Sequence, residues 1–403
     1  MKFLMKRSWF SRDLLGFSLT SFFNDFNHEM ITSILPLYIF QLFGAAHAPQ
    51  YLGIIAGFSK FASMGANLIS GWLSGKIKNQ KKLLIVGYAL TPLFSSLIGA
   101  VHHVFSIVLF RTIAWSGRGL REPVRDAWLS AITPTRDYGK VFGVQRAMDT
   151  LGALCGPLVA YFLLSQVSVR SIFFIALIPG FFSVISLMYL VKNYTVKQMN
   201  TKSITLLHHF IQLPKQVIFF IGIRFLFGIA YYDRMLIILR AQESMTGQTV
   251  SSIAAAGWAI LLYSFFNCIR LIGEIAIGSL SDLYKLNKKY LLAGCGCGIF
   301  GLLNCALLIN ELSIWYWLLI FLAAGLSVAT ITVLEKAYLA QLLPHQFATR
   351  AYSFLAAADG ASALCSGLIV GMLWSHVGAQ SAFMFAAVIS FASLISLILI
   401  RDK

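Results

Sequence analysis

The chain has 403 residues, of which 58% are hydrophobic and 12% are charged, and its formal net charge is +17. A soluble domain of this length needs far more charge on its surface, so the composition excludes that class. Such a basic balance would indicate nucleic-acid binding in a soluble protein. Here the basic residues lie mostly in short connections between apolar stretches, so we interpret the charge as a signal of membrane topology.

Twelve apolar stretches are long enough to cross a bilayer. We predict membrane-spanning helices at 14–43, 50–74, 83–101, 104–133, 141–164 and 171–191, and then at 214–239, 251–277, 290–309, 314–343, 348–374 and 380–400. Of the 32 Lys and Arg residues, 20 lie on one predicted side of the membrane, and only Arg170 and Arg240 lie on the other. The positive-inside rule therefore predicts a multi-pass membrane protein with both termini in the cytoplasm.

The longest connection, 192–215, divides the chain into two predicted halves of six spans, 1–191 and 216–403. An offset of 210 residues aligns nine identities in 32 positions, among them Asp149 with Asp359. A second echo, at an offset of 207, aligns Lys81-Lys82 with Lys288-Lys289. Two parallel repeats predict a solute site between the halves, near the bilayer midplane.

These halves and their motifs resemble the major facilitator superfamily, in particular a bacterial subgroup of it, and this resemblance implies a location in a bacterial inner membrane. Gly71 matches the first glycine of that family's loop motif between spans 2 and 3, although Gly75 stands where the family has Asp. The second copy keeps Gly278 and Asp282. The resemblance implies an all-α integral membrane fold of two six-helix repeats that works by alternating access. It also implies a cavity lined by spans 1, 4, 7 and 10, and a gating role for Gly71 and Asp282.

A glycine-proline element in the fifth span, Gly152, Gly156 and Pro157, is similar to the motif that the family associates with antiporters. Glycine and proline also serve close helix packing and kinks, so this element is weak evidence for the direction of transport.

The first span carries Asp25, His28 and Glu29 on one helical face. Two close carboxylates resist ionising together, so one of them can hold a proton, and we predict these three residues as candidates for proton coupling. The alternative is that Asp25 and Glu29 only neutralise arginines of other spans. Asp359, which has no basic neighbour on its own helix, is a further coupling candidate.

The fourth span carries the densest charge: Arg111, Arg118, Arg121, Glu122, Arg125 and Asp126. Arg118 and Glu122 are i,i+4 partners, yet four arginines face only two acids. Because the resemblance places this span on the cavity, the surplus predicts contact with a solute that carries a carboxylate or phosphate. The alternative is purely structural pairing, for which Arg125 and Asp126 are the first candidates.

Charges in later spans divide into two groups. Asp233, Arg234 and Glu335 are candidate cavity residues, because adjacent charges cannot pair with each other and the resemblance places spans 7 and 10 on the cavity. Arg146 with Asp149 and Arg270 with Glu274 are i,i+3 and i,i+4 pairs, which we predict to be structural.

The sequence holds no phosphate-binding loop, zinc-ligand spacing or nucleophile constellation, so we expect neither an enzyme nor a bound metal or cofactor. We predict a secondary transporter of a small polar or anionic organic solute, coupled to protons, with export preferred. The alternatives are uptake of a nutrient or an iron-chelating carboxylate, and a solute sensor that transports nothing. The expected partners are the solute, protons and the lipid bilayer, with no nucleic acid, and the expected state is a monomer.

Overall fold

The computed structural model describes residues 11–77, 79–134, 137–193, 213–246, 251–283, 287–309, 313–342 and 348–400, and these residues form helices joined by short connections. The first part of the chain holds α1 (Arg12–Lys76), α2 (Gln80–Leu97), α3 (Val104–Ile132), α4 (Tyr138–Leu164), α5 (Val169–Ile175) and α6 (Leu177–Leu190). The second part holds α8 (Lys215–Ala230), α9 (Arg234–Thr246), α10 (Ser252–Leu283), α11 (Lys288–Leu291), α12 (Ile299–Ala306), α13 (Ile314–Leu342), α14 (Ala348–His376) and α15 (Ala379–Ile398).

Ten helical stretches of the described chain are long and apolar enough to cross a membrane. The first of them, α1, covers two predicted spans, which meet at a kink at Gly44. The φ of Gly44 is 75°, a value that glycine adopts readily. The predicted fourth span is also a continuous helix, α3. It is not among these ten stretches because it contains too many charged residues. The twelve predicted spans thus all correspond to helical segments.

Several spans differ from straight helices, among them the sixth, which is divided at Ala176 between α5 and α6. The predicted seventh span is broken between α8 and α9, and Tyr231, Tyr232 and Asp233 form the non-helical link. Backbone groups freed in a membrane must find partners inside the protein. The Asp233 carboxylate accepts a hydrogen bond from the backbone N–H of Met235 at 3.0 Å and so caps α9. In the ninth span, Leu292–Gly298 forms a π-helix between α11 and α12.

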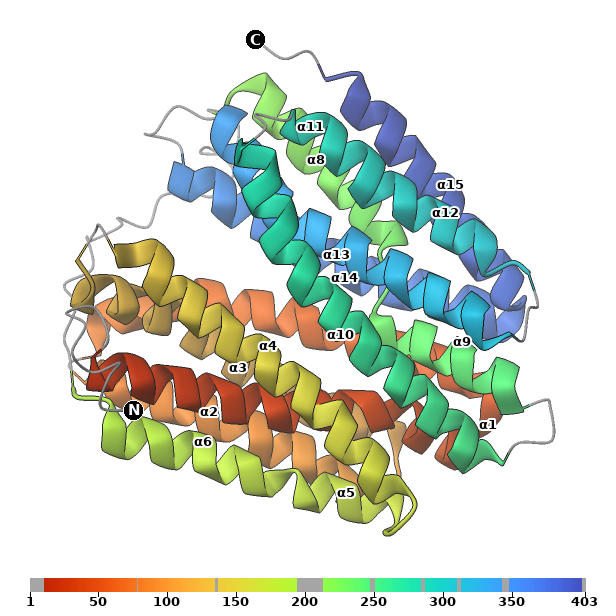
Figure 1. Cartoon of the computed structure of the whole chain (residues 1–403), viewed down its shortest axis with the longest axis horizontal. Coiled ribbons are helices and arrows are strands. Elements are labelled where there is room, and N and C mark those ends of the chain that lie inside the picture. Colours follow the sequence, from red (N-terminus) through yellow and green to blue (C-terminus); the bar gives the residue numbers. More distant parts are fainter. Residues whose placement is uncertain are drawn as a thin grey trace. The chain divides into compact units, whose positions relative to one another are not determined.

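The chain divides into two compact units. Unit 1 comprises residues 1–38 and 58–201, and unit 2 comprises residues 39–57 and 202–403. In unit 1, α2 packs against α3 and α6 (Figure 1). Apolar side chains bury the interface between these helices, and Phe17, Tyr88 and Trp128 are the largest of them.

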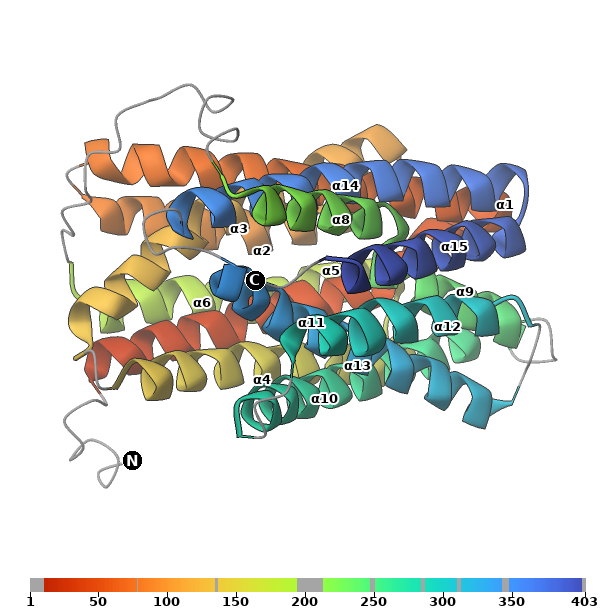
Figure 2. The ribbon, with the colours of Figure 1, turned by 90° about the horizontal axis from the view of Figure 1, so that it is seen from above.

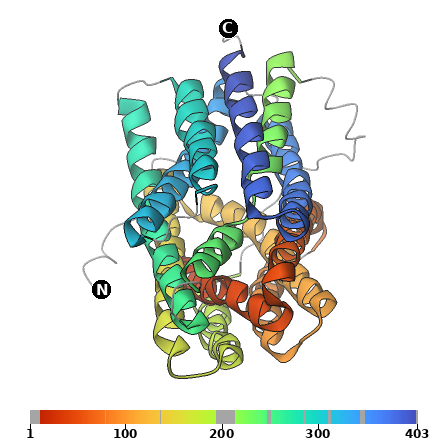
Figure 3. The ribbon, with the colours of Figure 1, turned by 90° about the vertical axis from the view of Figure 1, so that its right-hand side faces the viewer.

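In unit 2, α8 packs against both α14 and α15, and α10 packs against α13. Figure 2 shows α8 beside α14, and Figure 3 shows α8 in green beside α15 in dark blue. Residues 39–57 belong to this unit because their helix packs closely on α14. Gly53 and Gly57 face Gly367 and Leu364, and a Cβ atom added at Gly57 would lie 3.1 Å from the Cα of Leu364.

One lysine in each unit caps the last helix of its repeat. In unit 1, Lys81 at the start of α2 donates from Nζ to the carbonyl of Met188 at 2.9 Å, near the end of α6. In unit 2, Lys289 at the start of α11 donates from Nζ to the carbonyl of Ile400 at 2.8 Å, beyond the end of α15. A cation at a helix C-terminus satisfies free carbonyls and complements the helix dipole.

Candidate functional site

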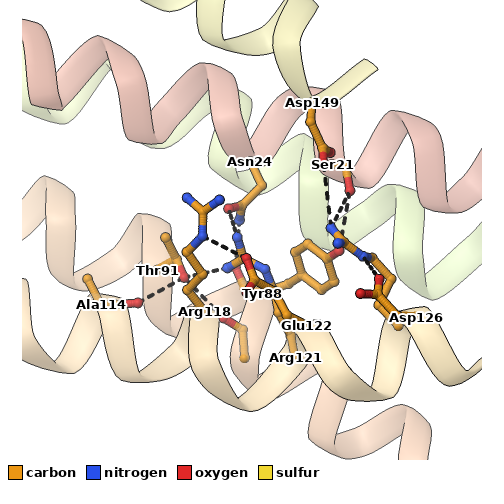
Figure 4. A network of polar contacts seen from close by, with 12 residues as sticks. Ser21, Asn24, Tyr88, Thr91, Ala114, Arg118, Arg121, Glu122, Asp126 and Asp149 are labelled. Carbon is orange, nitrogen blue, oxygen red and sulfur yellow. Dashed lines mark hydrogen bonds and ion pairs between the residues drawn. The ribbon is translucent and has the colours of Figure 1, made fainter. Parts of the chain in front are cut away.

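The polar cluster of unit 1 is built on α3, whose helical period turns its arginines toward α1 and α2 (Figure 4). Arg118 forms the expected ion pair with Glu122, with 2.8 Å between Nε and Oε1. Both side chains are partly exposed, at 26% and 32%. They lie in the middle of a membrane-spanning helix, where contact of an ion pair with lipid is costly, so this exposure favours contact with water.

Arg121 is buried differently, with only 3% of its surface exposed. One terminal nitrogen donates to Oγ1 of Thr91 on α2 and the other to Oδ1 of Asn24 on α1, each at 2.6 Å. Its guanidinium also lies over the ring of Tyr88, 4.5 Å from the centroid. Figure 4 shows the side chain held between these neutral groups. The sequence predicted Arg121 as a candidate cavity residue, and the structure shows that it joins α3 to α1 and α2.

Arg125 forms a charged node near one end of the cluster. Its Nε lies 2.9 Å from Asp126, and Nη1 lies 3.8 Å from Asp149 on α4 and 3.4 Å from the hydroxyl of Ser21 on α1. Gln145 also donates to Asp149, at 3.1 Å. Arg125 and Asp126 therefore pair as the structural alternative anticipated, and Asp149 lies near a cation of the neighbouring helix in addition to the charge of Arg146 on its own helix.

The acids of α1 lie beside these arginines. Asp25 is partly exposed, and among the described residues it makes no hydrogen bond and no ion pair. Its carboxylate interacts through its charge with Arg118, Arg121 and Asp149. Glu29, one turn further on, is buried and also acts on Arg118.

His28 and Arg111 are buried around Trp115. The imidazole of His28 meets the indole edge-on, with 5.3 Å between the ring centroids. Arg111, 1% exposed, lies 6.0 Å from the same indole and donates to the hydroxyl of Thr32 at 2.7 Å. This end of the cluster joins α3 to α1 through packing and hydrogen bonds.

Two glycines of α4 set how closely α1 approaches. A Cβ atom at Gly156 would lie 2.6 Å from the carbonyl oxygen of Phe26 and 2.7 Å from the nitrogen of Met30, and one at Gly152 would meet the carbonyl of Phe22. These backbone positions flank Asp25 and Glu29. The glycine-proline element therefore packs α4 against the acid-bearing turns of α1, with Pro157 inside α4.

Unit 2 contains a second charged node. Arg224 on α8 is buried, and its Nη2 lies 2.6 Å from Oε2 of Glu335 on α13 and 3.4 Å from Oδ1 of Asp359 on α14. Glu335 and Asp359 were predicted for different roles, and the structure brings them to one guanidinium. Arg224 was not among the predicted site residues. The signal for it was present, since a buried arginine in a span requires an acid from another helix.

The remaining predicted residues lie apart from these nodes or are incompletely described. Asp233 caps α9 as described above, and Arg234 follows it with its guanidinium 5.7 Å from the ring centroid of Tyr263. Arg270 and Glu274 form their expected i,i+4 pair at 3.2 Å. Arg146 is exposed on α4, and its charge acts on Asp149, its predicted i,i+3 partner. Gly71 lies in α1 and Asp282 in α10, but their surroundings fall outside the described part of the chain.

The charges of unit 1 now come close to balance. Arg118 pairs with Glu122 and interacts electrostatically with Asp25 and Glu29 of α1. Arg125 pairs with Asp126 and lies near Asp149 of α4. The arginine surplus counted on α3 alone is therefore offset by its neighbours. Within this balanced cluster, Arg118 and Asp25 are a cation and an acid that are both partly exposed.

Comparisons with known proteins agree with this architecture. The family model of the Major Facilitator Superfamily matches residues 17–232 and 223–403. The chain is 32% identical over 391 residues to an uncharacterized MFS-type transporter of Methanocaldococcus jannaschii, covering 96% of this chain and 94% of that one. It is 24% identical over 375 residues to the multidrug resistance protein MdtG of Proteus mirabilis, covering 91% and 90%.

Solved structures show the same fold at low sequence identity. The nucleoside transporter NupG aligns with a TM-score of 0.81 at 13% identity, covering 97% of this chain and 99% of NupG. A peptide transporter POT in complex with sulfate aligns with a TM-score of 0.78 at 14% identity, covering 98% and 95%. The helical repeats, the extent of the family match and the full-length relative lead to one conclusion: the chain belongs to the Major Facilitator Superfamily, as a multi-pass membrane transporter.

Proposed function

We propose that this transporter moves a small organic anion together with a proton, with Arg118 as the anchor for the anion and Asp25 as the proton site. The observation that carries this proposal is the state of Asp25, a carboxylate in a membrane-spanning helix that makes no hydrogen bond or ion pair among the described residues. Acidic residues within membrane-spanning helices commonly mark proton relays, which supports the choice of Asp25 as the proton site.

The charge balance links the two sites. Arg118 already forms an ion pair with Glu122, and it is attracted electrostatically to Asp25 and Glu29. A proton on Asp25 removes one negative charge beside Arg118, and this strengthens the attraction of Arg118 for an anion. Proton and anion therefore bind more tightly together than apart, which is the requirement for movement in the same direction.

Export by exchange with protons is the second candidate. It rests on the likeness to MdtG and to the multidrug resistance efflux pump PmrA of Streptococcus pneumoniae, which is 27% identical over 161 residues, 40% of each chain. The glycine-proline element of α4 supports the same candidate. A cationic or neutral solute would then compete with the proton for Asp25. In both schemes we place the two termini in the cytoplasm, on the distribution of basic residues.

Transport by purified protein in proteoliposomes distinguishes the two. The probes are radiolabelled organic anions, each paired with its uncharged amide, under a pH gradient of either direction. An acidic exterior should drive accumulation of an anion and leave its amide behind. Accumulation of cationic or neutral probes under an acidic interior would favour exchange and count against symport.

Asp25→Asn removes the proton site and keeps its shape. We expect it to abolish gradient-driven accumulation while equal-pH exchange of the anion persists. Glu29→Gln tests the neighbouring buried acid in the same way. Asp126→Asn is the matched control, because that acid is half-exposed and already paired with Arg125. Normal gradient-driven transport in Asp25→Asn would exclude Asp25 from coupling.

A further inference from the structure

An aromatic side chain, Trp115, lies within the row of charged residues on α3. Four residues recur at helical spacing along one side of this helix: Arg111, Trp115, Arg118 and Glu122. The guanidinium carbon of Arg118 lies 5.6 Å from the centroid of the indole, and that of Arg111 lies 6.0 Å from it. The indole therefore has a cation on each side of it along the helix.

The other tryptophan of α3, Trp128, has a different environment. It is fully buried, its Nε1 donates to Oε1 of Gln80 at 2.8 Å, and its ring meets Phe17 edge-on. Trp115 is partly exposed, and its Nε1 is a buried atom without a hydrogen-bond partner among the described residues. A buried donor without an acceptor is unfavourable, so its presence calls for an explanation. The two indoles of one helix thus differ in exposure and in hydrogen bonding.

His28 of α1 holds the indole of Trp115 from one side. Its imidazole lies edge-on to the indole, with 5.3 Å between the ring centroids and 72° between the planes, and it is itself 1% exposed. The exposed part of the indole lies in the same row of α3 as the partly exposed Arg118, whose ion pair favours contact with water. An apolar ring and a cation therefore lie next to each other at this point of unit 1.

We propose that Trp115 binds the apolar part of the solute whose carboxylate Arg118 holds, and that this solute is a planar aromatic carboxylate. The inference rests on the proposed role of Arg118 as the anion anchor. A flat ring stacks on an indole, which adds to the gain from burying apolar area, whereas a puckered aliphatic ring of similar size gains the burial alone. Arg118 lies across the indole, so its turn toward a bound carboxylate uncovers more of the ring.

The spacing of the two groups limits the shape of the solute. Trp115 and Arg118 are i,i+3 neighbours, so the charge of the solute has to be close to its ring, as in benzoate and unlike a long-chain fatty acid. An acceptor atom on that ring can satisfy the indole N–H. Water can supply the same acceptor, and isomers of the ligand that differ only in the position of the acceptor distinguish the two sources.

Variants of the two tryptophans separate solute binding from helix packing. Trp115→Leu removes the aromatic face and keeps an apolar side chain, whereas Trp115→Phe keeps an aromatic ring and removes the N–H. Trp128→Phe is the matched control, because it removes an indole N–H from the same helix at a fully buried position. Arg118→Gln removes the proposed anchor. Should Trp115→Leu fail to fold, the selectivity of the wild type and of Trp115→Phe still tests the inference.

The readout is equilibrium dialysis of radiolabelled benzoate against purified protein in detergent micelles at neutral pH. Unlabelled acetate, cyclohexanecarboxylate and the three pyridinecarboxylate isomers serve as competitors. We expect the wild type to bind benzoate about tenfold more tightly than cyclohexanecarboxylate, and Trp115→Leu to lose this preference while its affinity for acetate stays within about twofold. One pyridinecarboxylate should bind more tightly than benzoate to the wild type and lose that advantage in Trp115→Phe. Trp128→Phe should lower thermal stability and leave the affinity ratios unchanged.

Several results would overturn the inference. Among these are a wild type that binds no benzoate, equal wild-type affinities for benzoate and cyclohexanecarboxylate, and a preference that persists in Trp115→Leu. Equal binding of benzoate and all three isomers would assign the acceptor to water and overturn that part of the inference. Benzoate binding that persists in Arg118→Gln would overturn both the inference and the proposed anchor. Binding that depends on Trp115 and Arg118, without accumulation of benzoate under a pH gradient of either direction, would uphold the inference and overturn the proposed function alone.

Discussion

The charged nodes of the two units occupy corresponding helices but distribute their residues differently. In unit 1, Arg125 of α3 lies between Asp126 and Asp149, and Ser21 of α1 completes the node. In unit 2, the acid Glu335 occupies the position that corresponds to Arg125 at the offset of 210 residues. The arginine lies instead on α8, as Arg224, and it contacts Glu335 and Asp359.

The residues at the closest helix contacts are also distributed differently between the two units. In unit 1 the glycines lie on α4, where Gly152 and Gly156 face the backbone of α1. The corresponding positions of α14 are Ser362 and Ser366, and the glycine is on the partner helix, where Gly228 of α8 faces Ser362. The comparison teaches that each repeat keeps one cation between two acids and one glycine at the closest approach, and that either helix can supply them.

The largest expected effect concerns the two arginines. Arg224→Gln removes the buried cation that the buried Glu335 and the partly exposed Asp359 share, so we expect a loss of about 3–5 kcal/mol in the free energy of unfolding, mainly from Glu335. Arg125→Gln should cost about 1 kcal/mol, because Asp126 is half-exposed and Asp149 keeps its hydrogen bond from Gln145. Equilibrium unfolding of purified protein in mixed micelles measures both. Arg224→Gln with Glu335→Gln should regain part of the loss, and equal losses in the single arginine variants would refute the asymmetry.

The glycine contacts allow a sharper test of whether the two arrangements are interchangeable. Gly228→Ala should cost about 1–3 kcal/mol, because its Cβ would collide with the side chain of Ser362. Adding Ser362→Gly removes that side chain, and we expect it to recover at least half of the cost. Gly152→Ala meets the backbone of Phe22, so no side-chain truncation should rescue it. A double variant of unit 2 no more stable than Gly228→Ala would show that the contact tolerates only one arrangement.

The smallest expected effect concerns the lysine caps, which the two units share. Lys81→Gln and Lys289→Gln each remove a cation from a helix C-terminus, worth about 0.5–1 kcal/mol. Lys289 is only 3% exposed, so its substitution should cost the more of the two. Thermal unfolding of the single variants measures the difference, and Lys82→Gln, at an exposed neighbouring position, is the control that should change little.

The sequence predicted the helices well because hydropathy over about 20 residues is a strong signal. The i,i+4 pairs Arg118–Glu122 and Arg270–Glu274 also followed from spacing alone. Partners on different helices did not, because their contact depends on helix rotation and depth. Arg224 with Glu335 and Asp359 is the clearest case, separated by more than a hundred residues along the chain. The break at Tyr231–Asp233 was missed as well, because hydropathy does not register a change in backbone conformation.

The helix α3 has a consequence for the synthesis of the protein. Its arginines each oppose insertion into a bilayer by about 2.5–3.5 kcal/mol, so this helix cannot partition into lipid on its own. The hydrogen-bond partners of Arg111 and Arg121 lie on α1 and α2, which leave the ribosome earlier. When α3 is synthesised, the helices that carry these hydrogen-bond partners are therefore already present. Arg224 is synthesised before Glu335 and Asp359, so the arginine of α8 lacks these ion-pair partners until α13 and α14 have been made. Biogenesis of the second half is therefore the step at which a truncated or stalled chain would be exposed to quality control.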